Sequence, residues 1–238
     1  MQLKNAVVLV TGANRGIGAE FVAQLKQRGA SKIYAASRDG AVEVEGVEPI
    51  RLDITDPAQI EAAAAAAGDV QVLINNAGIS TGTSVITGEL ADIRREMDTN
   101  FYGSLLMTQA FAPILKANGG GAIVNVISAL SWFTVPGAGA YTASKAAAWS
   151  LTDSARLELA DQGTQVVGVH MGLVDTDMAA GTDAPKISPA VVATAGLDAI
   201  ESELDEVLAD DWSKMVKSGL PLSPSARYEQ IFSALSGS

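Results

Sequence analysis

The chain has 238 residues, of which 48% are hydrophobic, and this length and composition predict a single domain spanning residues 1–238. Sixteen basic against 27 acidic side chains give a formal charge of −11, which disfavours nucleic acid or an anionic membrane as a partner. The chain has no cysteine and only one histidine, which excludes metal sites built from thiolates or from several histidines. We therefore predict no metal. The first apolar run is too short for a signal peptide, and we expect a cytoplasmic protein.

Short β-branched runs alternate with helical stretches along the chain. The predicted strands are 7–10, 33–36, 70–74, 122–126 and 165–169. The predicted helices are 18–28, 56–67, 91–116, 141–161 and 188–204. This alternation predicts an α/β fold, a Rossmann-like doubly wound parallel sheet with helices on both faces. Ligands of such sheets bind beyond the carboxyl ends of the strands, where the strand-to-helix loops gather.

A glycine-rich turn follows the first predicted strand and opens the first predicted helix. Its spacing is G-x-x-x-G-x-G, and glycines in this context let the backbone approach a pyrophosphate at a helix N-terminus. A purely structural turn is the alternative. We predict that the turn binds a dinucleotide through Gly12, Asn14, Arg15, Gly16, Ile17 and Gly18.

A tyrosine and a lysine stand one helical turn apart in the fourth predicted helix. Tyr141 and Lys145 share a helix face, so we expect the ammonium to lower the pKa of the phenol and to favour acid/base chemistry near neutral pH. Such a pair is also typical of a solvated helix surface. Its interpretation therefore depends on the other motifs, which include Ser128, thirteen residues upstream of Tyr141.

In combination these motifs resemble the short-chain dehydrogenase/reductase superfamily in its compact form, over Leu3 to about Leu208. Residues 11–18 look like its cofactor turn and residues 75–78, Asn-Asn-Ala-Gly, like its strand-four signature. The resemblance implies a catalytic tetrad of Asn100, Ser128, Tyr141 and Lys145.

The resemblance also implies a role for each member of the tetrad. Tyr141 is the proton donor to a substrate carbonyl, and Ser128 hydrogen-bonds the same oxygen. Lys145 holds the nicotinamide ribose, and Asn100 positions a relay water. Taken alone, Ser128 would be read as a turn serine and Asn100 as a structural amide. Together they imply a reversible reductase of ketones and aldehydes acting on a small-molecule carbonyl or alcohol.

Cofactor choice depends on the residues that follow the second predicted strand. Ser37 stands where an acidic residue would bind the ribose of NAD, and Arg38 and Arg15 can reach a 2′-phosphate, so NADP(H) is favoured over NAD(H). The alternative is that the arginines are surface charges and that Asp39 binds the ribose. The further cofactor-binding residues implied by the resemblance are Asp53, beside adenine, and Ile54, Asn75, Ala77, Gly78, Val174 and Thr176.

The substrate side carries one departure from the family pattern. Met171 replaces the proline of a Pro-Gly-x-Val-x-Thr segment, which puts the rigidity of that loop in doubt, and His170 beside it is interpreted as structural. A loop near 177–187 is expected to cover the substrate. We expect a pocket for an uncharged, partly hydrophobic carbonyl, lined by Ser128, Trp132, Phe133, Leu173 and Met178. Packing in the core or between subunits is an alternative role for Trp132 and Phe133.

The C-terminal segment near 209–238 departs from the common family ending. A short strand within 206–211 and a helix over 212–220 are predicted, and the last dozen residues look loosely specified. The resemblance implies a homodimer or homotetramer formed through helices 91–116 and 141–161. A catalytically silent dinucleotide-sensing or scaffold protein is the main competing function. An epimerase or dehydratase ranks last, because such relatives carry a larger C-terminal domain.

Overall fold

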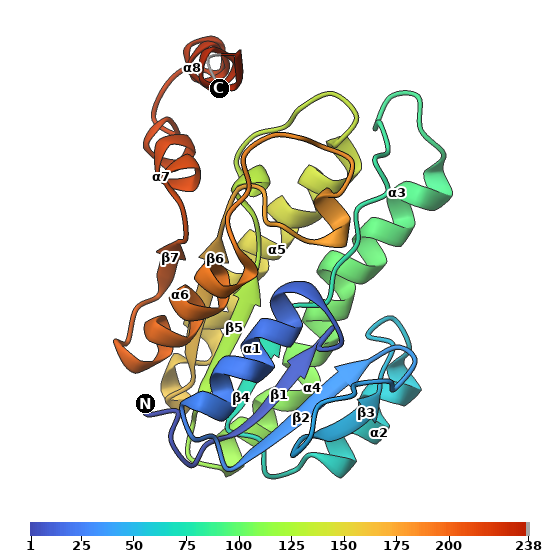
Figure 1. The fold of residues 1–238 in the computed structure, drawn as a ribbon, viewed down its shortest axis with the longest axis vertical. Helices are drawn as coiled ribbons and strands as arrows, with labels where there is room; N and C mark the ends of the chain where they lie inside the picture. Colours follow the sequence, from blue (N-terminus) through green and yellow to red (C-terminus); the bar gives the residue numbers. More distant parts are fainter. Residues whose placement is uncertain (237–238) are drawn as a thin grey trace.

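The computed structural model describes residues 1–236 and contains a seven-stranded parallel sheet in the order β3-β2-β1-β4-β5-β6-β7 (Figure 1). The strands are β1 Val7–Thr11, β2 Lys32–Ser37, β3 Glu48–Arg51, β4 Val72–Asn75, β5 Ala122–Val126, β6 Gln165–His170 and β7 Glu206–Leu208. The helices are α1 Gly16–Gln27, α2 Pro57–Ala66, α3 Leu90–Met97, α4 Ser104–Ala117, α5 Gly139–Glu158, α6 Pro189–Glu201, α7 Asp211–Ser218 and α8 Pro224–Ser236. The predicted doubly wound sheet is confirmed. Within these residues no helix is long and apolar enough to cross a membrane.

Strand β3 is the one sheet element that the sequence pattern did not indicate. It pairs in parallel with β2 at the sheet edge, with Ala35 opposite Pro49. Most of its four residues are exposed, and a proline inside so short a run argues against a strand from the sequence alone. An edge strand tolerates Pro49 because the missing backbone N–H lies on a side that needs no partner.

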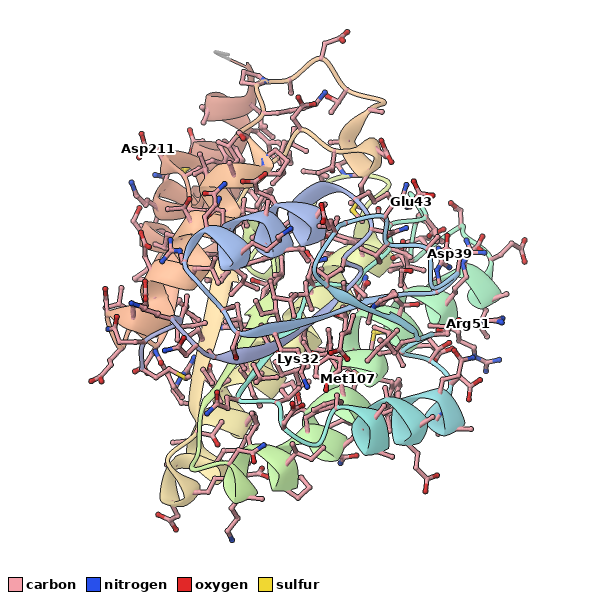
Figure 2. All side chains as sticks on the ribbon, turned by 60° about the horizontal axis from the view of Figure 1, so that its bottom comes forward. Lys32, Asp39, Glu43, Arg51, Met107 and Asp211 are labelled. Carbon is pink, nitrogen blue, oxygen red and sulfur yellow. The ribbon has the colours of Figure 1, made fainter. Side chains whose placement is uncertain are left out.

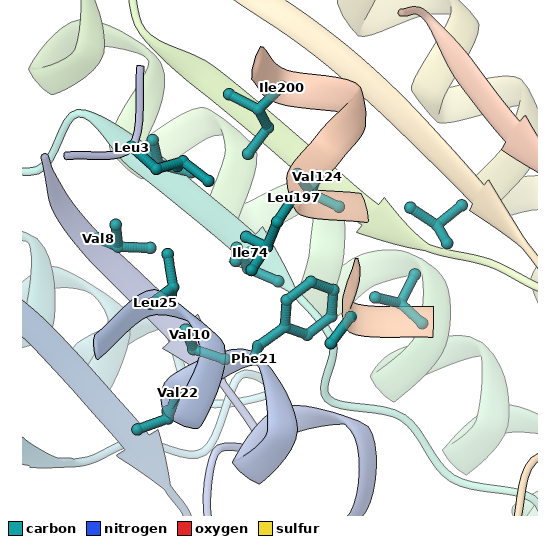
Figure 3. Packing of buried hydrophobic residues seen from close by; sticks show 14 of the residues in the cluster. Leu3, Val8, Val10, Phe21, Val22, Leu25, Ile74, Val124, Leu197 and Ile200 are labelled. Atoms are coloured by element: carbon teal, nitrogen blue, oxygen red, sulfur yellow. The ribbon is translucent and has the colours of Figure 1, made fainter. Parts of the chain in front are cut away.

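The chain separates charged and apolar side chains between the outside and the inside of the molecule. Glu43 and Asp211 lie on the outside, whereas Met107 is fully buried (Figure 2). Two hydrophobic clusters fill the space on either side of the sheet. On one face, Phe21 of α1 and Leu197 of α6 pack against Val8 and Val10 of β1 (Figure 3). The intervening Leu9 belongs to the second cluster, as expected when successive strand residues face opposite sides.

The second face is covered by α2, α4 and α5. Ile60 and Phe111 belong to its cluster together with Leu73 of β4. The stretch predicted as one helix over 91–116 is divided, because the π-helical turn Asp98–Gly103 separates α3 from α4. Such wide turns inside helices are frequent at functional sites, and this one contains Asn100.

The C-terminal segment is more ordered than the sequence indicated. The predicted short strand and following helix appear as β7 and α7. Most of the last dozen residues, expected to be loose, belong to α8, and residues 237–238 lie outside the described residues. Ile231 of α8 is buried in a third cluster with Trp132, Phe133 and Val216. The overlooked signal is a serine before Pro224, because serine caps helices and proline is favoured at their first position.

Candidate active site

A cleft of about 1840 Å³ opens along the carboxyl ends of the strands, where the strand-to-helix loops gather. Most residues predicted to bind cofactor or substrate line it, although they come from loops far apart in the chain. The predicted residues on its wall are Gly12, Asn14, Arg15, Gly16, Ile17, Ser37, Arg38, Asp53, Ile54, Ala77, Gly78, Ser128, Tyr141, Lys145, Leu173, Val174, Thr176 and Met178.

The glycine turn is held against the loop that follows β4. Gly12 and Gly16 have φ of +64° and +53°, a left-handed conformation in which a side chain would be strained. The Thr11 hydroxyl accepts hydrogen bonds from the backbone N–H groups of Asn76 and Ala77 at 3.0 and 3.1 Å. These contacts fix the turn at the head of α1, where an anionic group would meet free backbone N–H donors.

Gly18 and Asn75 do not line the cleft, which corrects two predicted cofactor contacts. A Cβ at Gly18 would lie 2.0 Å from the Gly12 carbonyl oxygen, so this glycine allows α1 to pack closely on the turn. Asn75 is buried and donates to the Asn125 side chain at 2.9 Å, joining β4 to β5. The next residue, Asn76, lines the cleft and Asn75 does not.

Gly18→Ala should therefore destabilise the whole domain. The added methyl cannot be accommodated without moving backbone, and overpacking of this kind costs about 1–3 kcal/mol, with larger values where backbone must shift. Urea unfolding monitored by circular dichroism measures the loss. Gly68→Ala is the matched control, because a Cβ there meets no atom within 4 Å. Equal unfolding free energies for the two variants would contradict this role for Gly18.

Ser128, Tyr141 and Lys145 meet at one end of the cleft. Ser128 follows β5 and caps a short 3₁₀ turn, its hydroxyl accepting from the Leu130 N–H at 3.1 Å. The same hydroxyl is near enough to the phenol of Tyr141 on α5 to lower the pKa of that phenol. Lys145, one turn further along α5, is buried and donates from Nζ to the Val126 carbonyl oxygen at 2.9 Å. A hydroxyl, a phenol and an ammonium thus face the same space.

The pKa of Tyr141 is raised, which corrects the expectation that Lys145 lowers it. Burial raises this pKa to about 12, the hydrogen bond from Ser128 opposes the rise, and the charge of Glu96 adds to it. The Lys145 ammonium lies 5.7 Å from the centre of the phenol ring and is bonded elsewhere, and burial lowers its own pKa to about 8. Tyr141 in this state is a protonated phenol at neutral pH, ready to donate.

Asn100 is buried and does not line the cleft, whereas its neighbour Thr99 does. Its side chain is fully used: Nδ2 donates to the Ile79 carbonyl and the Ser144 hydroxyl at 2.9 Å each, and Oδ1 accepts from the Ile79 N–H at 2.9 Å. A Cβ at Gly78 would come within 3.1 Å of Asn100 Oδ1 and 3.6 Å of Lys145 Nζ. The amide therefore fixes the loop after β4 beside the lysine.

Glu96 is a buried carboxylate that the sequence analysis did not identify. It is fully buried on α3 and accepts hydrogen bonds from the backbone N–H and the hydroxyl of Thr81, a residue on the cleft wall. Its second oxygen has no partner among the described residues. The helical pattern places Glu96 one turn before Asn100, but nothing in the sequence shows that this side of α3 faces the loop.

Glu96→Gln should shift the pH dependence of any reaction that uses the Tyr141 phenolate to lower pH. A nearby negative charge disfavours the phenolate, so its removal lowers the pKa of Tyr141, and the phenolate forms at lower pH. Glutamine can still accept from Thr81. The pH–rate profile of kcat measures the shift, with exposed Glu89→Gln as the control. An unmoved profile would show that the charge of Glu96 does not reach the phenol.

Three arginines surround the far end of the cleft. Arg38 follows β2, Arg51 ends β3, and Arg15 lies in the glycine turn. Arg51 was missed with its strand, and Asp39 lies at the same end of the sheet (Figure 2). One Asp39 oxygen accepts from the Ser37 hydroxyl at 2.8 Å and from the Ala41 N–H at 3.0 Å, and the serine bond lowers the pKa of that carboxyl. That oxygen is thus already used within the turn.

The loop near 177–187, which is predicted to cover the substrate, is held by backbone hydrogen bonds at its base and by an ion pair at its start. Ile187 N–H donates to the Leu173 carbonyl at 2.9 Å, and Asp175 N–H to the Ile187 carbonyl at 2.9 Å. Arg15 bonds the Asp177 carboxylate at 2.6 Å, but both side chains are largely exposed, so this pair contributes little stability. Residues 177–179 with their neighbours thus lie over the glycine turn and line the cleft.

Trp132 and Phe133 do not line the cleft, which corrects the predicted substrate wall. Both are buried against α7 and α8 in the third cluster, and Phe133 meets Trp212 edge-on at 5.9 Å between ring centres. Trp132 and Phe133 therefore have the alternative role, which is packing in the core. Leu130, from the turn after Ser128, lines the cleft together with the predicted Leu173 and Met178. This wall is apolar.

The C-terminal segment supports the loop in which Met171 replaces proline. Met171 is buried, and its carbonyl accepts from the Ala129 N–H at 2.8 Å. The Gly172 N–H donates to the Asp210 carboxylate at 2.8 Å, and the same carboxylate caps α7. A Cβ at Gly172 would lie 2.9 Å from Trp212. Tertiary contacts thus hold the loop in place of a proline ring.

A doubly wound sheet with a glycine turn at one end of its cleft and a serine, a tyrosine and a lysine at the other defines a Rossmann-fold oxidoreductase. The family model described as short chain dehydrogenase matches residues 6–186. The chain therefore belongs to the short-chain dehydrogenase/reductase family.

Individual relatives are similar over most of their length. A 3α-hydroxysteroid dehydrogenase of Mediterraneibacter gnavus is 34% identical over 206 residues, 80% of this chain and 82% of the relative. A 3-alpha-(or 20-beta)-hydroxysteroid dehydrogenase of Mycobacterium tuberculosis is 33% identical, over 74% and 72% of the two chains. A short chain dehydrogenase of Burkholderia cenocepacia, solved in complex with NADP, is 38% identical with a TM-score of 0.92, over 97% of this chain and 98% of that one.

Proposed function

We propose that this enzyme is an NADPH-dependent reductase of uncharged ketones and aldehydes that also runs in reverse as an alcohol dehydrogenase. The observation that carries the proposal is the meeting of Ser128, Tyr141 and Lys145 on the wall of one cleft whose other end is a glycine turn. When bound, the cofactor supplies the hydride. The protein's own residues bind the substrate oxygen, supply its proton and exclude water.

The residues of the cleft fit a nicotinamide dinucleotide. Gly12 and Gly16 leave the head of α1 open to a pyrophosphate, and Lys145 is placed to hold a ribose beside Tyr141. Asp53, which is predicted to lie beside adenine, lines the cleft. Arg38 and Arg51 provide positive charge where the overall charge of −11 would repel a third phosphate, which supports NADP over NAD.

The chemistry of the protein groups follows from their charge states. Negative charge develops on the substrate oxygen during reduction, and the Ser128 hydroxyl is placed to stabilise it while the Tyr141 phenol donates its proton. A half-buried phenol whose pKa is raised to about 12 keeps that proton until the oxygen has become basic enough to take it. In the oxidation direction the phenolate accepts the alcohol proton, so oxidation should accelerate as pH rises.

The substrate class is set by an apolar wall. Leu130, Leu173 and Met178 line the cleft that Ser128 and Tyr141 share, which favours an uncharged carbonyl on a hydrophobic skeleton. Two relatives are named for hydroxysteroids, and this supports an oxosteroid as a test substrate.

Loss of absorbance of the reduced nicotinamide, followed with NADPH and with NADH, tests the proposal. The panel contains an aliphatic ketone, an aromatic aldehyde, a keto ester, an oxosteroid and a keto acid. We expect turnover with NADPH on uncharged members and little with the keto acid. Preference for the keto acid would overturn the substrate class, and tight NADPH binding without any turnover would favour the silent sensor or scaffold.

A further inference from the structure

We propose that His170 is a positioning residue that fixes Ser128 for catalysis, and this inference rests on the proposed function. His170 is the last residue of β6 and is fully buried, so its ring touches neither the cleft nor solvent. Its Nδ1 lies 3.2 Å from the Ser128 carbonyl oxygen. A carbonyl can only accept, so Nδ1 carries the proton and donates it to this bond.

The backbone around Ser128 shows why this bond matters. Ile127 N–H donates to Val169 at 2.9 Å and Ala129 N–H donates to Met171 at 2.8 Å, so β6 holds the turn on both sides of the serine. The serine's own carbonyl accepts from His170, from the Ser131 hydroxyl at 2.8 Å and from the Ser131 backbone N–H at 3.1 Å. Fixing that carbonyl fixes the peptide plane, and with it the direction in which Ser128 Oγ meets Tyr141.

The ring of His170 is itself held in one orientation. Trp132 stacks on it with ring centres 4.0 Å apart and an interplanar angle of 17°. Its Nε2 lies 3.5 Å from the Glu206 carboxylate of β7, which is paired with Lys217 of α7. The serine turn is thereby connected to the C-terminal segment through one ring. The tryptophan that fails to line the cleft instead supports a residue behind it.

The charge of the ring is settled by its surroundings. Burial lowers the pKa of His170 to about 4, the bond to Ser128 opposes this, and the charged groups that face the ring come from three elements. These groups are Glu206 of β7, Lys217 of α7, and Asp153 and Lys145 of α5. The ring is neutral at pH 7, and its role is to donate a hydrogen bond and not to carry charge.

Two variants separate the hydrogen bond from the ring. His170→Phe keeps an aromatic ring against Trp132 but loses the donor, whereas His170→Asn loses the ring but places an amide donor at the position of Nδ1. If His170 positions Ser128, activity follows the donor. We expect kcat for the carbonyl found in the panel to fall about tenfold in the Phe variant, the scale of one hydrogen bond, and to be largely restored in the Asn variant.

A second readout distinguishes positioning from mere stability. The Ser128 bond lowers the pKa of Tyr141, so a displaced serine should move the rising limb of alcohol oxidation to higher pH, while the KM for NADPH stays unchanged. Tyr228→Phe, which removes the partner of the Thr134 N–H in the same C-terminal cluster, is the control and should move neither value.

The possible results decide the question. Activity that follows the ring, with Phe active and Asn inactive, or an equal loss in both, would overturn the inference. If the Phe variant does not fold, His170→Gln replaces it, because its amide lies at the ε position and should rescue less than Asn. A wild-type enzyme inactive on every carbonyl would count against the proposed function instead, before any variant is compared.

Discussion

Tyr141→Phe is expected to lower kcat by about 10²- to 10⁴-fold, the usual contribution of a positioned proton donor. The phenol is the acidic group that meets Ser128 in the cleft, and the neighbouring Lys145 is held by the Val126 carbonyl. Phenylalanine keeps the ring and removes only the hydroxyl, so binding of NADPH should persist. Steady-state kinetics give kcat, and a fluorescence titration gives the dissociation constant for NADPH.

The control for this variant is Tyr228→Phe, which makes the same chemical change outside the cleft. It should retain wild-type turnover. Substantial activity in Tyr141→Phe would mean that another group supplies the proton. Loss of NADPH binding together with turnover would instead show that the phenol holds the cofactor and would leave its catalytic role unsupported.

Arg38→Asp is expected to weaken NADPH binding by about tenfold to a hundredfold, which is the scale of one or two charge-assisted hydrogen bonds. The change removes a cation at the end of β2 and places a carboxylate beside a 2′-phosphate. NADH has no such phosphate and should bind with nearly its original affinity, so the preference between the two cofactors should narrow or reverse. Dissociation constants for both cofactors, measured at one ionic strength, give the result.

Arg94→Asp changes the net charge by the same amount on an exposed helix position outside the cleft. It should leave both dissociation constants within a factor of about two, because a distant surface charge is screened. If Arg38→Asp and Arg94→Asp behave alike, the preference for NADPH does not come from the end of β2. An unchanged preference in Arg38→Asp would place the phosphate contact on Arg15 or Arg51.

Much of the fold could be predicted because its central strands are buried on both faces. Their β-branched runs read clearly, and the loops at their carboxyl ends brought Ser128, Tyr141 and the glycine turn into one cleft. Strand β3 escaped because it is an exposed edge with Pro49, and α8 because one face of it is stabilised by the third cluster rather than by its own composition.

The parts of the site that could not be predicted depend on packing between distant segments. The side of α3 that carries Glu96, and the partners of Trp132 and His170, are decided by where loops and the C-terminal segment settle. The pKa of Tyr141 also depends on packing that the sequence does not show. The i, i+4 spacing placed Lys145 beside the phenol, but burial of the phenol determines the direction of the shift.

The central claim is that hydride passes from the nicotinamide to a carbonyl carbon while Tyr141 supplies the proton. We would reduce the best substrate of the panel with NADPH that carries deuterium at both C4 positions, in ordinary water, and analyse the alcohol by mass spectrometry. We expect one deuterium on the carbinol carbon of every product molecule, and none when deuterated water replaces the labelled cofactor. Product without the label from the cofactor would contradict it.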